Sequence, residues 1–297
     1  MSVADPQQQL APTAPLQLSG KRTPAAFGRL LLSEMRLIVG RRRNQAGIGV
    51  LMVIPVIMTI ALKASSDGGE SGEGGPLFLA AAINNGYFVA LAALGIEIGL
   101  FLPLAVSWLS GDSIAGEANL GTLRYLLTVP VGRTTLLAMK YLSLLIGAFI
   151  GVLAVALAGL VAGGIAFGFG PVTLLSGTQL AFAPALLRLL LAALYLTAGL
   201  GALAAIGLFV STLTEQPLGA TIATVALSTL MWILDTIPQL DWLHPWLLVD
   251  RWLAFADLLR DPVLLDTISR GLLVDLAYAA VFLAAAWARF TAKDVSG

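Results

Sequence analysis

The chain has 297 residues, of which 58% are hydrophobic and 11% are charged, and its mean hydropathy is +0.90. In soluble domains roughly a quarter of all residues are charged, so this composition excludes an ordinary soluble protein and predicts a polytopic α-helical membrane protein. The formal net charge of +0 excludes bulk attraction to nucleic acid, and the lack of cysteine excludes disulfides and Cys-based metal sites.

The N-terminal region predicts a tail followed by a surface helix. Residues 1–22 are rich in Gln, Pro and Ala and lack the pattern of a signal peptide, so we expect a disordered cytosolic tail. Within 23–43 apolar residues recur at helical spacing, namely Phe27, Leu30, Leu31, Met35 and Ile38. This spacing favours an amphipathic helix lying on the lipid bilayer surface, or alternatively a stop signal ahead of the first span.

Long apolar stretches follow. A helix needs about 20 residues to cross a hydrocarbon core about 30 Å thick, and residues 141–187, which contain no charged residue, have room for two crossings. We expect six spans, at about 47–62, 83–109, 136–167, 184–212, 218–237 and 271–289. The predicted fold class is therefore all-α, with a single transmembrane domain over 23–297.

The positions of the basic residues predict the orientation, because Lys and Arg near span ends stay in the cytosol. Most Lys and Arg residues fall on the side of the N-terminus, within 21–43, 124–140 and 289–293. The exceptions are Lys63, Arg188, Arg251, Arg260 and Arg270. We expect a multi-pass protein of the plasma membrane with both termini in the cytosol.

On the outer side, residues 239–269 interrupt the apolar pattern. Trp242, Trp246 and Trp252 stand among several Asp residues, a mixture typical of the headgroup boundary. The segment predicts one or two short amphipathic helices on the outer surface. They act either as a gate for substrate release or as an anchor for the fifth and sixth spans.

Two carboxyl groups are expected at membrane depth, Glu97 in the second span and Asp275 in the sixth. A charged residue at a helix centre costs roughly 2.5 to 3.5 kcal/mol on insertion scales, so such acids face a partner, a cavity or a pathway. The alternative is a protonated or hydrogen-bonded structural acid. Arg188, near the outer end of the fourth span, is a candidate ion-pair partner for either acid.

Several kinds of chemistry have no sequence signal. There is no G-x-x-x-x-G-K-[ST] loop for phosphate, and the single histidine, His244, cannot build an H-E-x-x-H zinc site. We expect no catalytic residue, no metal and no cofactor in this chain. Gly-x-x-x-Gly spacings predict close helix packing, either within the chain or across a dimer, at 95/99, 147/151, 159/163 and 164/168.

Residues 111–135 form a polar connector between the second and third spans. Asp112, Glu117, Arg124 and Arg133 lie here between segments too apolar for water, which predicts a contact surface in the cytosol.

The connector also predicts a short helix with an apolar stripe. Leu120, Leu123 and Leu127 share one face, and Pro130 with Gly132 ends the helix. An exposed apolar stripe beside charges favours docking of the helix into a groove of a partner.

This pattern resembles the connector of permease subunits of ABC-2 type ATP-binding cassette transporters. The matching residues are Glu117, Gly121-Thr122-Leu123, Leu126-Leu127, Pro130, Arg133 and Lys140, while Arg124 stands where such permeases often have an acidic residue. The layout is similar as well, with a basic amphipathic helix first, six spans, and extra outer helices before the last span.

The resemblance implies a coupling helix seated in a separate ATPase subunit, which binds ATP and Mg, and a second permease chain, identical or paralogous. The implied contact residues are Asp112, Glu117, Leu120, Thr122, Leu123, Arg124, Leu127 and Arg133. The chain is then the permease of an ATP-driven exporter. The competing hypothesis is an ion- or proton-coupled secondary transporter that uses Glu97 and Asp275.

Overall fold

The computed structural model describes residues 24–67, 85–121, 132–174 and 176–292. The predicted tail at 1–22 and the middle of the connector, 122–131, lie outside these ranges. The α-helices are α1 (Pro24–Gly40), α2 (Arg42–Asp67), α4 (Gly86–Glu97), α5 (Phe101–Asn119), α7 (Arg133–Phe167), α8 (Phe182–Leu213), α9 (Pro217–Asp235) and α10 (Leu265–Ala292).

The other described elements are short. An antiparallel hairpin of β1 (Val172–Thr173) and β2 (Gln179–Leu180) precedes α8, with Val172 paired to Leu180. Between α9 and α10 lie the 3-10 helices η1 (Pro238–Leu240), η2 (His244–Trp246) and η3 (Trp252–Leu259).

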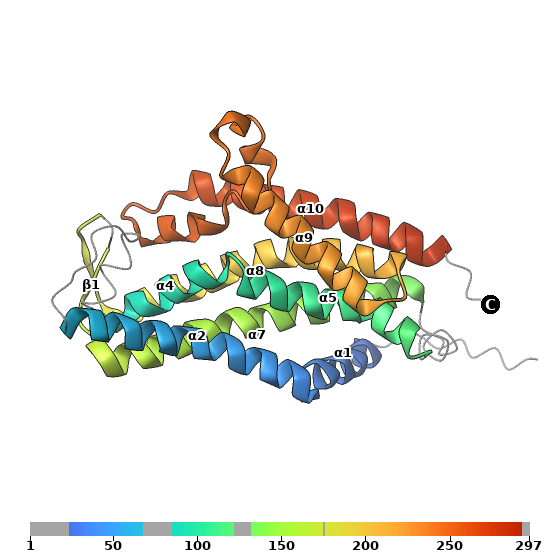
Figure 1. Cartoon of the computed structure of the whole chain (residues 1–297), viewed down its shortest axis with the longest axis horizontal. Coiled ribbons are helices and arrows are strands. Elements are labelled where there is room, and N and C mark those ends of the chain that lie inside the picture. The colour runs from blue at the N-terminus through green and yellow to red at the C-terminus, as the bar shows by residue number, and fades with distance from the viewer. Residues whose placement is uncertain (1–23, 68–84, 122–131, 175, 293–297) are drawn as a thin grey trace, which may run out of the picture.

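The long helices run side by side along one axis (Figure 1). At one end of this bundle lie α1, the end of α5, the start of α7 and the end of α10; we call it the connector end. The β1–β2 hairpin and the start of α4 lie at the opposite end, which we call the hairpin end. This arrangement brings the described members of the predicted contact residues, Asp112, Glu117, Leu120 and Arg133, to one end of the molecule.

The structure confirms a mostly helical chain with several helices able to span a membrane. Within the described residues, α2, α7, α8, α9 and α10 are each long and apolar enough, and α4 with α5 adds a sixth if that bent pair is one span. These helices fit a membrane protein, while the count of six spans stays a prediction.

Helix α8 forms the centre of the bundle. It packs against α5, α7, α9, α10 and η3. Of its most apolar stretch 72% is buried inside the protein, against 17% for α2 and for α10. Helices α2 and α10, at the periphery of the bundle, instead expose large apolar side chains such as Ile57 and Val281. Lipid tails are as apolar as these side chains, so this surface suits a bilayer.

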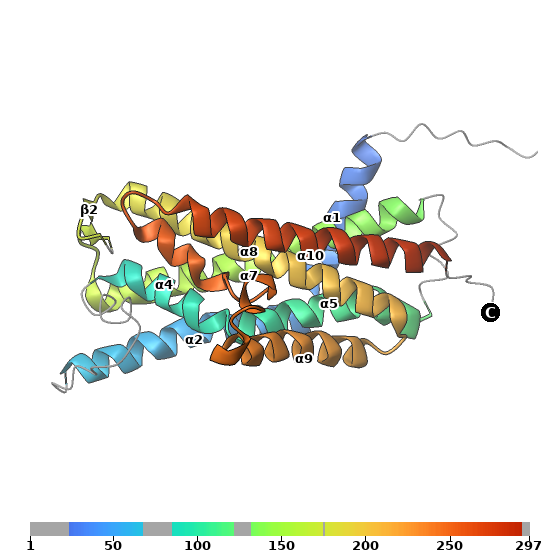
Figure 2. The same cartoon turned by 90° about the horizontal axis from the view of Figure 1, so that it is seen from above.

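The first helix is present where the sequence predicted one, and it turns away from the bundle axis (Figure 2). Leu31, Met35 and Ile38 are half-buried, as expected for an apolar face. Ile38 approaches α7 at Gly147, where an added Cβ would lie 3.7 Å from its Cγ2. The side chains of Phe27, Arg29 and Leu30 lie outside the described residues, and the position of α1 on a membrane stays a prediction.

The second apolar segment is broken, which corrects the continuous span expected at 83–109. Helices α4 and α5 meet at an angle of 56°. Pro103 has no N–H to bond to the carbonyl of Gly99, and its ring clashes with that carbonyl in a straight helix. At the break, backbone N–H groups instead bond to the carbonyl three residues back, and the N–H of Leu100 donates to Glu97 O at 3.3 Å. Helix α5 then continues to Asn119, so the first part of the expected connector belongs to it.

Glycines set the packing of α4 on α7. A Cβ added to Gly163 would lie 2.4 Å from the carbonyl oxygen of Gly86, and one added to Gly159 would lie 2.7 Å from the Cα of Ala90. Only glycine allows such close backbone approach. The glycine pair at 159 and 163 therefore serves packing within the chain.

The outer segment folds partly into the bundle. Trp252 and Phe255 of η3 are buried against α8 and α10, whereas Trp242 and Trp246 are exposed. A short helix is present here, as expected, with one side packed into the bundle, and its position on the outer surface of a membrane stays a prediction. The aromatic side chains of η3 are large apolar groups that the core accepts.

Candidate functional site

The predicted contact residues that the structure describes all lie at the connector end. Asp112 and Glu117 stand on the last turns of α5, Leu120 directly follows α5, and Arg133 begins α7. The remaining predicted contact residues lie outside the described residues, namely Thr122, Leu123, Arg124 and Leu127.

Asp112 joins α5 to the junction of α1 and α2. Its Oδ2 accepts hydrogen bonds from Nη1 of Arg41, at 2.8 Å, and from Nη2 of Arg43. The guanidinium of Arg43 also stands over the ring of Trp108, 5.7 Å from the ring centroid, a cation–π contact. The Asp112 carboxylate is thus engaged by basic side chains of its own chain.

Lys140 holds three helices together. Its Nζ lies 2.6 Å from Oε1 of Glu117 on α5 and 3.7 Å from Oε1 of Glu34 on α1. Lys140 itself stands on α7, and its side chain is only 4% exposed. A buried ammonium needs such carboxylates, because removing a charge from water without a partner is costly.

Arg133 links the start of α7 to the end of α10. Its Nη1 donates to the carbonyl oxygens of Thr291, at 2.7 Å, and Phe290, at 3.3 Å. One turn away, Nε1 of Trp287 donates to Oγ1 of Thr134 at 2.9 Å. Helices α7 and α10 are therefore tied at the same end as Asp112 and Glu117.

Leu120 is one of the apolar side chains that this end exposes, and 69% of its surface is accessible. Gly121 has φ +68°, a left-handed conformation that ends a helix at little cost for glycine. The amide of Leu120 still donates to Gly116 O at 3.1 Å. The chain therefore leaves α5 with a leucine side chain pointing away from the bundle.

The two acids expected at membrane depth, Glu97 and Asp275, lie apart from the connector residues. Glu97 is fully buried at the end of α4, and neither of its oxygens has a hydrogen-bond partner among the described residues. Asp275 is buried on α10, facing α8 where Gly199 leaves room for it and for the indole of Trp252. Neither acid is brought into an ion pair within the described part of the chain.

The predicted pairing of Arg188 with Glu97 or Asp275 is wrong. Nη1 of Arg188 donates to the carbonyl oxygens of Leu258 and Arg260, both at 2.9 Å. These carbonyls close η3, and helix C-terminal carbonyls carry partial negative charge that attracts a guanidinium. Arg188 therefore anchors the outer segment to α8.

Sequence reasoning missed the network around Lys140. A signal was present, because Lys140 is the one charged residue within the expected span at 136–167. A cation at such a position predicts a carboxylate partner on a neighbouring helix. The partners Glu34 and Glu117 come from distant parts of the chain, so only the fold identifies them.

The connector end offers ion pairs, hydrogen bonds and an exposed apolar side chain, a combination suited to binding and to transmitting movement. Among the described residues, no group of three His, Asp or Glu side chains is placed to hold a metal ion. A family model described as a protein of unknown function (DUF2705) matches residues 78–296, which include α4 through α10. A search among curated proteins finds no match to the chain.

Proposed function

We propose that this chain, which belongs to the DUF2705 family of proteins of unknown function, is the membrane subunit of an ATP-driven transporter. A separate ATPase subunit, which binds ATP and Mg, docks at the connector end. In this proposal six spans cross the plasma membrane and both termini lie in the cytosol. Two permease chains complete the complex, and the direction of transport is export.

The observation that carries the proposal is the convergence of polar contacts at the connector end. Asp112, Lys140 and Arg133 tie α5 and α7, the helices that come before and after 122–131 in the sequence, to α1, α2 and α10. A displacement of the connector would therefore reach the first, second, third and last predicted spans together. A force-receiving element needs such coupling to the helices that move.

Leu120 supports the docking part of the proposal. Its exposed side chain lies two residues before the segment 122–131, where the sequence predicts Leu123 and Leu127 on the same helix face. Leucines spaced by three and four residues are the usual anchors of a helix in a groove. In the mechanism, ATP binding draws two ATPase subunits together, and the connectors pass this movement to the spans.

The test is a double variant, Leu123→Ala with Leu127→Ala, in complexes reconstituted with the ATPase subunit. We expect transport substrate to stimulate ATP hydrolysis in the wild type and to lose this effect in the variant. The matched control is Leu273→Ala with Leu276→Ala, two exposed leucines of α10. Full stimulation in the connector variant would show that 111–135 is not the coupling segment. Co-purification with an ATP-binding subunit after mild extraction tests docking itself.

Glu97 favours a second candidate, the secondary transporter. A fully buried carboxyl without a hydrogen-bond partner in the described residues is the kind of group that takes up and releases protons in transporters. The purified chain alone would then catalyse pH-driven uptake in liposomes, and Glu97→Gln would abolish it. Uptake that requires the ATPase subunit and persists in Glu97→Gln would exclude this candidate.

A further inference from the structure

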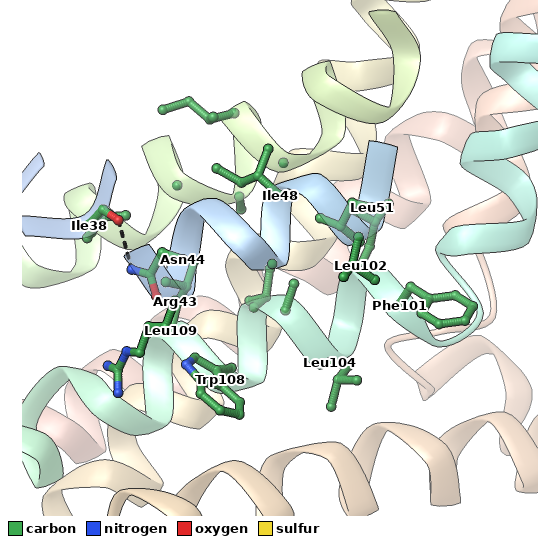
Figure 3. Close-up of a pocket in the computed structure, with 18 of the residues that line it drawn as sticks. Ile38, Arg43, Asn44, Ile48, Leu51, Phe101, Leu102, Leu104, Trp108 and Leu109 are labelled. Atoms are coloured by element: carbon green, nitrogen blue, oxygen red, sulfur yellow. Dashed lines mark hydrogen bonds between the residues drawn. The ribbon is translucent and has the colours of Figure 1, made fainter. Parts of the chain in front are cut away.

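A lateral groove lies between α2 and α5, with α7 as its floor (Figure 3). Its volume is about 260 Å³. One wall carries Ile48 and Leu51 of α2, and the other carries Phe101, Leu104 and Trp108 of α5. Apart from its connector end, the lining is apolar.

Small residues keep the groove open. Gly147, Ala148 and Gly151 of α7 form its floor, and Gly47 lines it from α2. A Cβ added to Gly47 would meet no atom within 4 Å, and one added to Gly151 would first meet Leu51 Cδ1 at 3.7 Å. The groove is thus an unfilled space along the flank of the bundle.

The polar groups of the groove are confined to its connector end. Figure 3 shows Arg43, Asn44 and Trp108 together there, while Phe101, Leu102 and Leu51 lie at the other end. The amide of Asn44 is already used, because Nδ2 donates to Ile38 O at 2.8 Å. The groove is therefore amphiphilic along its length, with a polar head and an apolar body.

The charge at the head is positive. Arg41, Arg42 and Arg43 follow one another, and all three are exposed. Among the described ion pairs they meet one carboxylate, Asp112, whose Oδ2 binds both Arg41 and Arg43. The Arg43 side chain remains 44% exposed despite this pair. Arg43 therefore brings positive charge to the groove that can attract an anion, and Trp108 beside it is a side chain that favours the headgroup level.

The shape and lining of the groove favour a lipid as its occupant. An acyl chain is flexible and apolar, and it matches the apolar body of a groove that opens on the flank of the bundle. The positive head then selects an acyl chain that carries a negative headgroup.

We propose that this groove is a binding site for an anionic phospholipid of the leaflet at the connector end. One acyl chain lies between α2 and α5, and the phosphate binds Arg43 at the polar head, beside Trp108. This site depends on no part of the transport proposal, because it requires neither the ATPase subunit nor a transported substrate.

The test is native mass spectrometry of the purified full chain, incubated with equal amounts of phosphatidylglycerol and phosphatidylcholine of matched acyl chains. We expect retention of phosphatidylglycerol roughly fivefold over phosphatidylcholine, the factor that one basic side chain supplies near an anionic lipid. Equal retention of the two lipids would overturn the proposal.

Two pairs of variants locate the site. Gly47→Leu fills the groove and should remove the bound phosphatidylglycerol, whereas Gly49→Leu, on the same helix and equally open but outside the groove, should retain it. Arg43→Gln should lower the preference to near parity, and Arg270→Gln, another arginine paired with an aspartate, should not change it. Arg41 still holds Asp112 in Arg43→Gln.

The variants also test the fold and the competing occupant. All should keep the wild-type Tm, and if Gly47→Leu fails to fold, Ala105→Leu on the opposite wall replaces it as the blocking variant. Identical lipid retention in the blocking variant and in Gly49→Leu would overturn the site. A wild-type dimer that only the blocking variant dissociates would show that a second copy occupies the groove, and this too would overturn it.

Discussion

The two ends of the bundle are held together by different chemistry. At the connector end, long charged side chains join the helices, as Lys140 does with Glu117 and Glu34. At the hairpin end, the backbone of α4 touches that of α7 through Gly86 and Gly163.

The comparison teaches which end can be rearranged. Flexible charged side chains can exchange partners while the backbone moves, and the exposed ion pairs of Arg41 and Arg43 with Asp112 contribute only about 0.2 to 1 kcal/mol each. Close-packed backbone contacts have no such tolerance, because packed interiors transmit strain rather than absorb it. We infer that the hairpin end is a fixed frame and that the connector end is where a partner can act.

Gly163→Leu should break the fixed frame and give the largest effect. An added Cβ would already lie 2.4 Å from Gly86 O and 2.7 Å from Val89 Cβ, so α4 would have to move away from α7. We expect a loss of about 3 kcal/mol or more in the free energy of unfolding. Thermal unfolding in detergent measures it, with Gly49→Leu as the control because its Cβ meets nothing within 4 Å. An unchanged Tm would contradict the packing of α4 on α7.

Lys140→Met should be the most damaging change at the connector end. It leaves Glu117 and Glu34 facing each other without their cation, and we expect a loss of about 2 kcal/mol, less than for a fully buried pair. Adding Glu117→Leu should recover part of this loss, as a double-mutant cycle of thermal unfolding will show. Purely additive effects of the two changes would mean that Lys140 and Glu117 do not interact.

Glu97→Met sharpens the comparison, because in the described residues Glu97 takes part neither in an ion pair nor in a close backbone contact between glycines. Replacing a buried carboxyl that has no hydrogen-bond partner in the described residues should raise the free energy of unfolding by about 1 kcal/mol. A higher Tm than that of the wild type checks it. A lower Tm would reveal a partner for Glu97 outside the described residues.

Arg41→Gln should have the smallest effect, about 0.5 kcal/mol, because Arg41 is partly exposed and Asp112 keeps Arg43. The effect should shrink further as salt is added, since exposed ion pairs are screened. Unfolding at low and high ionic strength measures this dependence. A loss as large as that of Lys140→Met would mean that the connector end is as rigid as the hairpin end.

Hydrophobic runs predicted the long helices within a few residues. The expected spans at 136–167 and 184–212 correspond to α7 (Arg133–Phe167) and α8 (Phe182–Leu213). Hydropathy alone did not locate the break at 98–100, although Gly99 and Pro103 are visible in the sequence. A proline breaks a helix through the carbonyl four residues before it, a backbone effect that a hydropathy window does not register.

The site was predictable in position but not in its contacts. Residue types placed Asp112, Glu117 and Arg133 at one polar connection between spans. Their partners Arg41, Lys140 and Thr291 follow from how distant helices meet, which one sequence does not show. The same reason explains the wrong pairing of Arg188, because the carbonyls of η3 are not visible as acceptors in a pattern of side chains.

The bend between α4 and α5 gives the second apolar segment a point at which it can flex. At the break, the N–H groups of Gly99 and Leu100 reach the carbonyls of Ile96 and Glu97 at 3.3 Å each, longer than the 3.0 Å bond of Ile98 to Leu94, so the two helices are not one stiff rod. We expect a rotation of α5 to be absorbed by changes in the backbone dihedral angles of residues 98–100. Helix α4 would stay packed on α7 while α5 pivots. One half of the segment would therefore move with the connector, and the other half would keep its position.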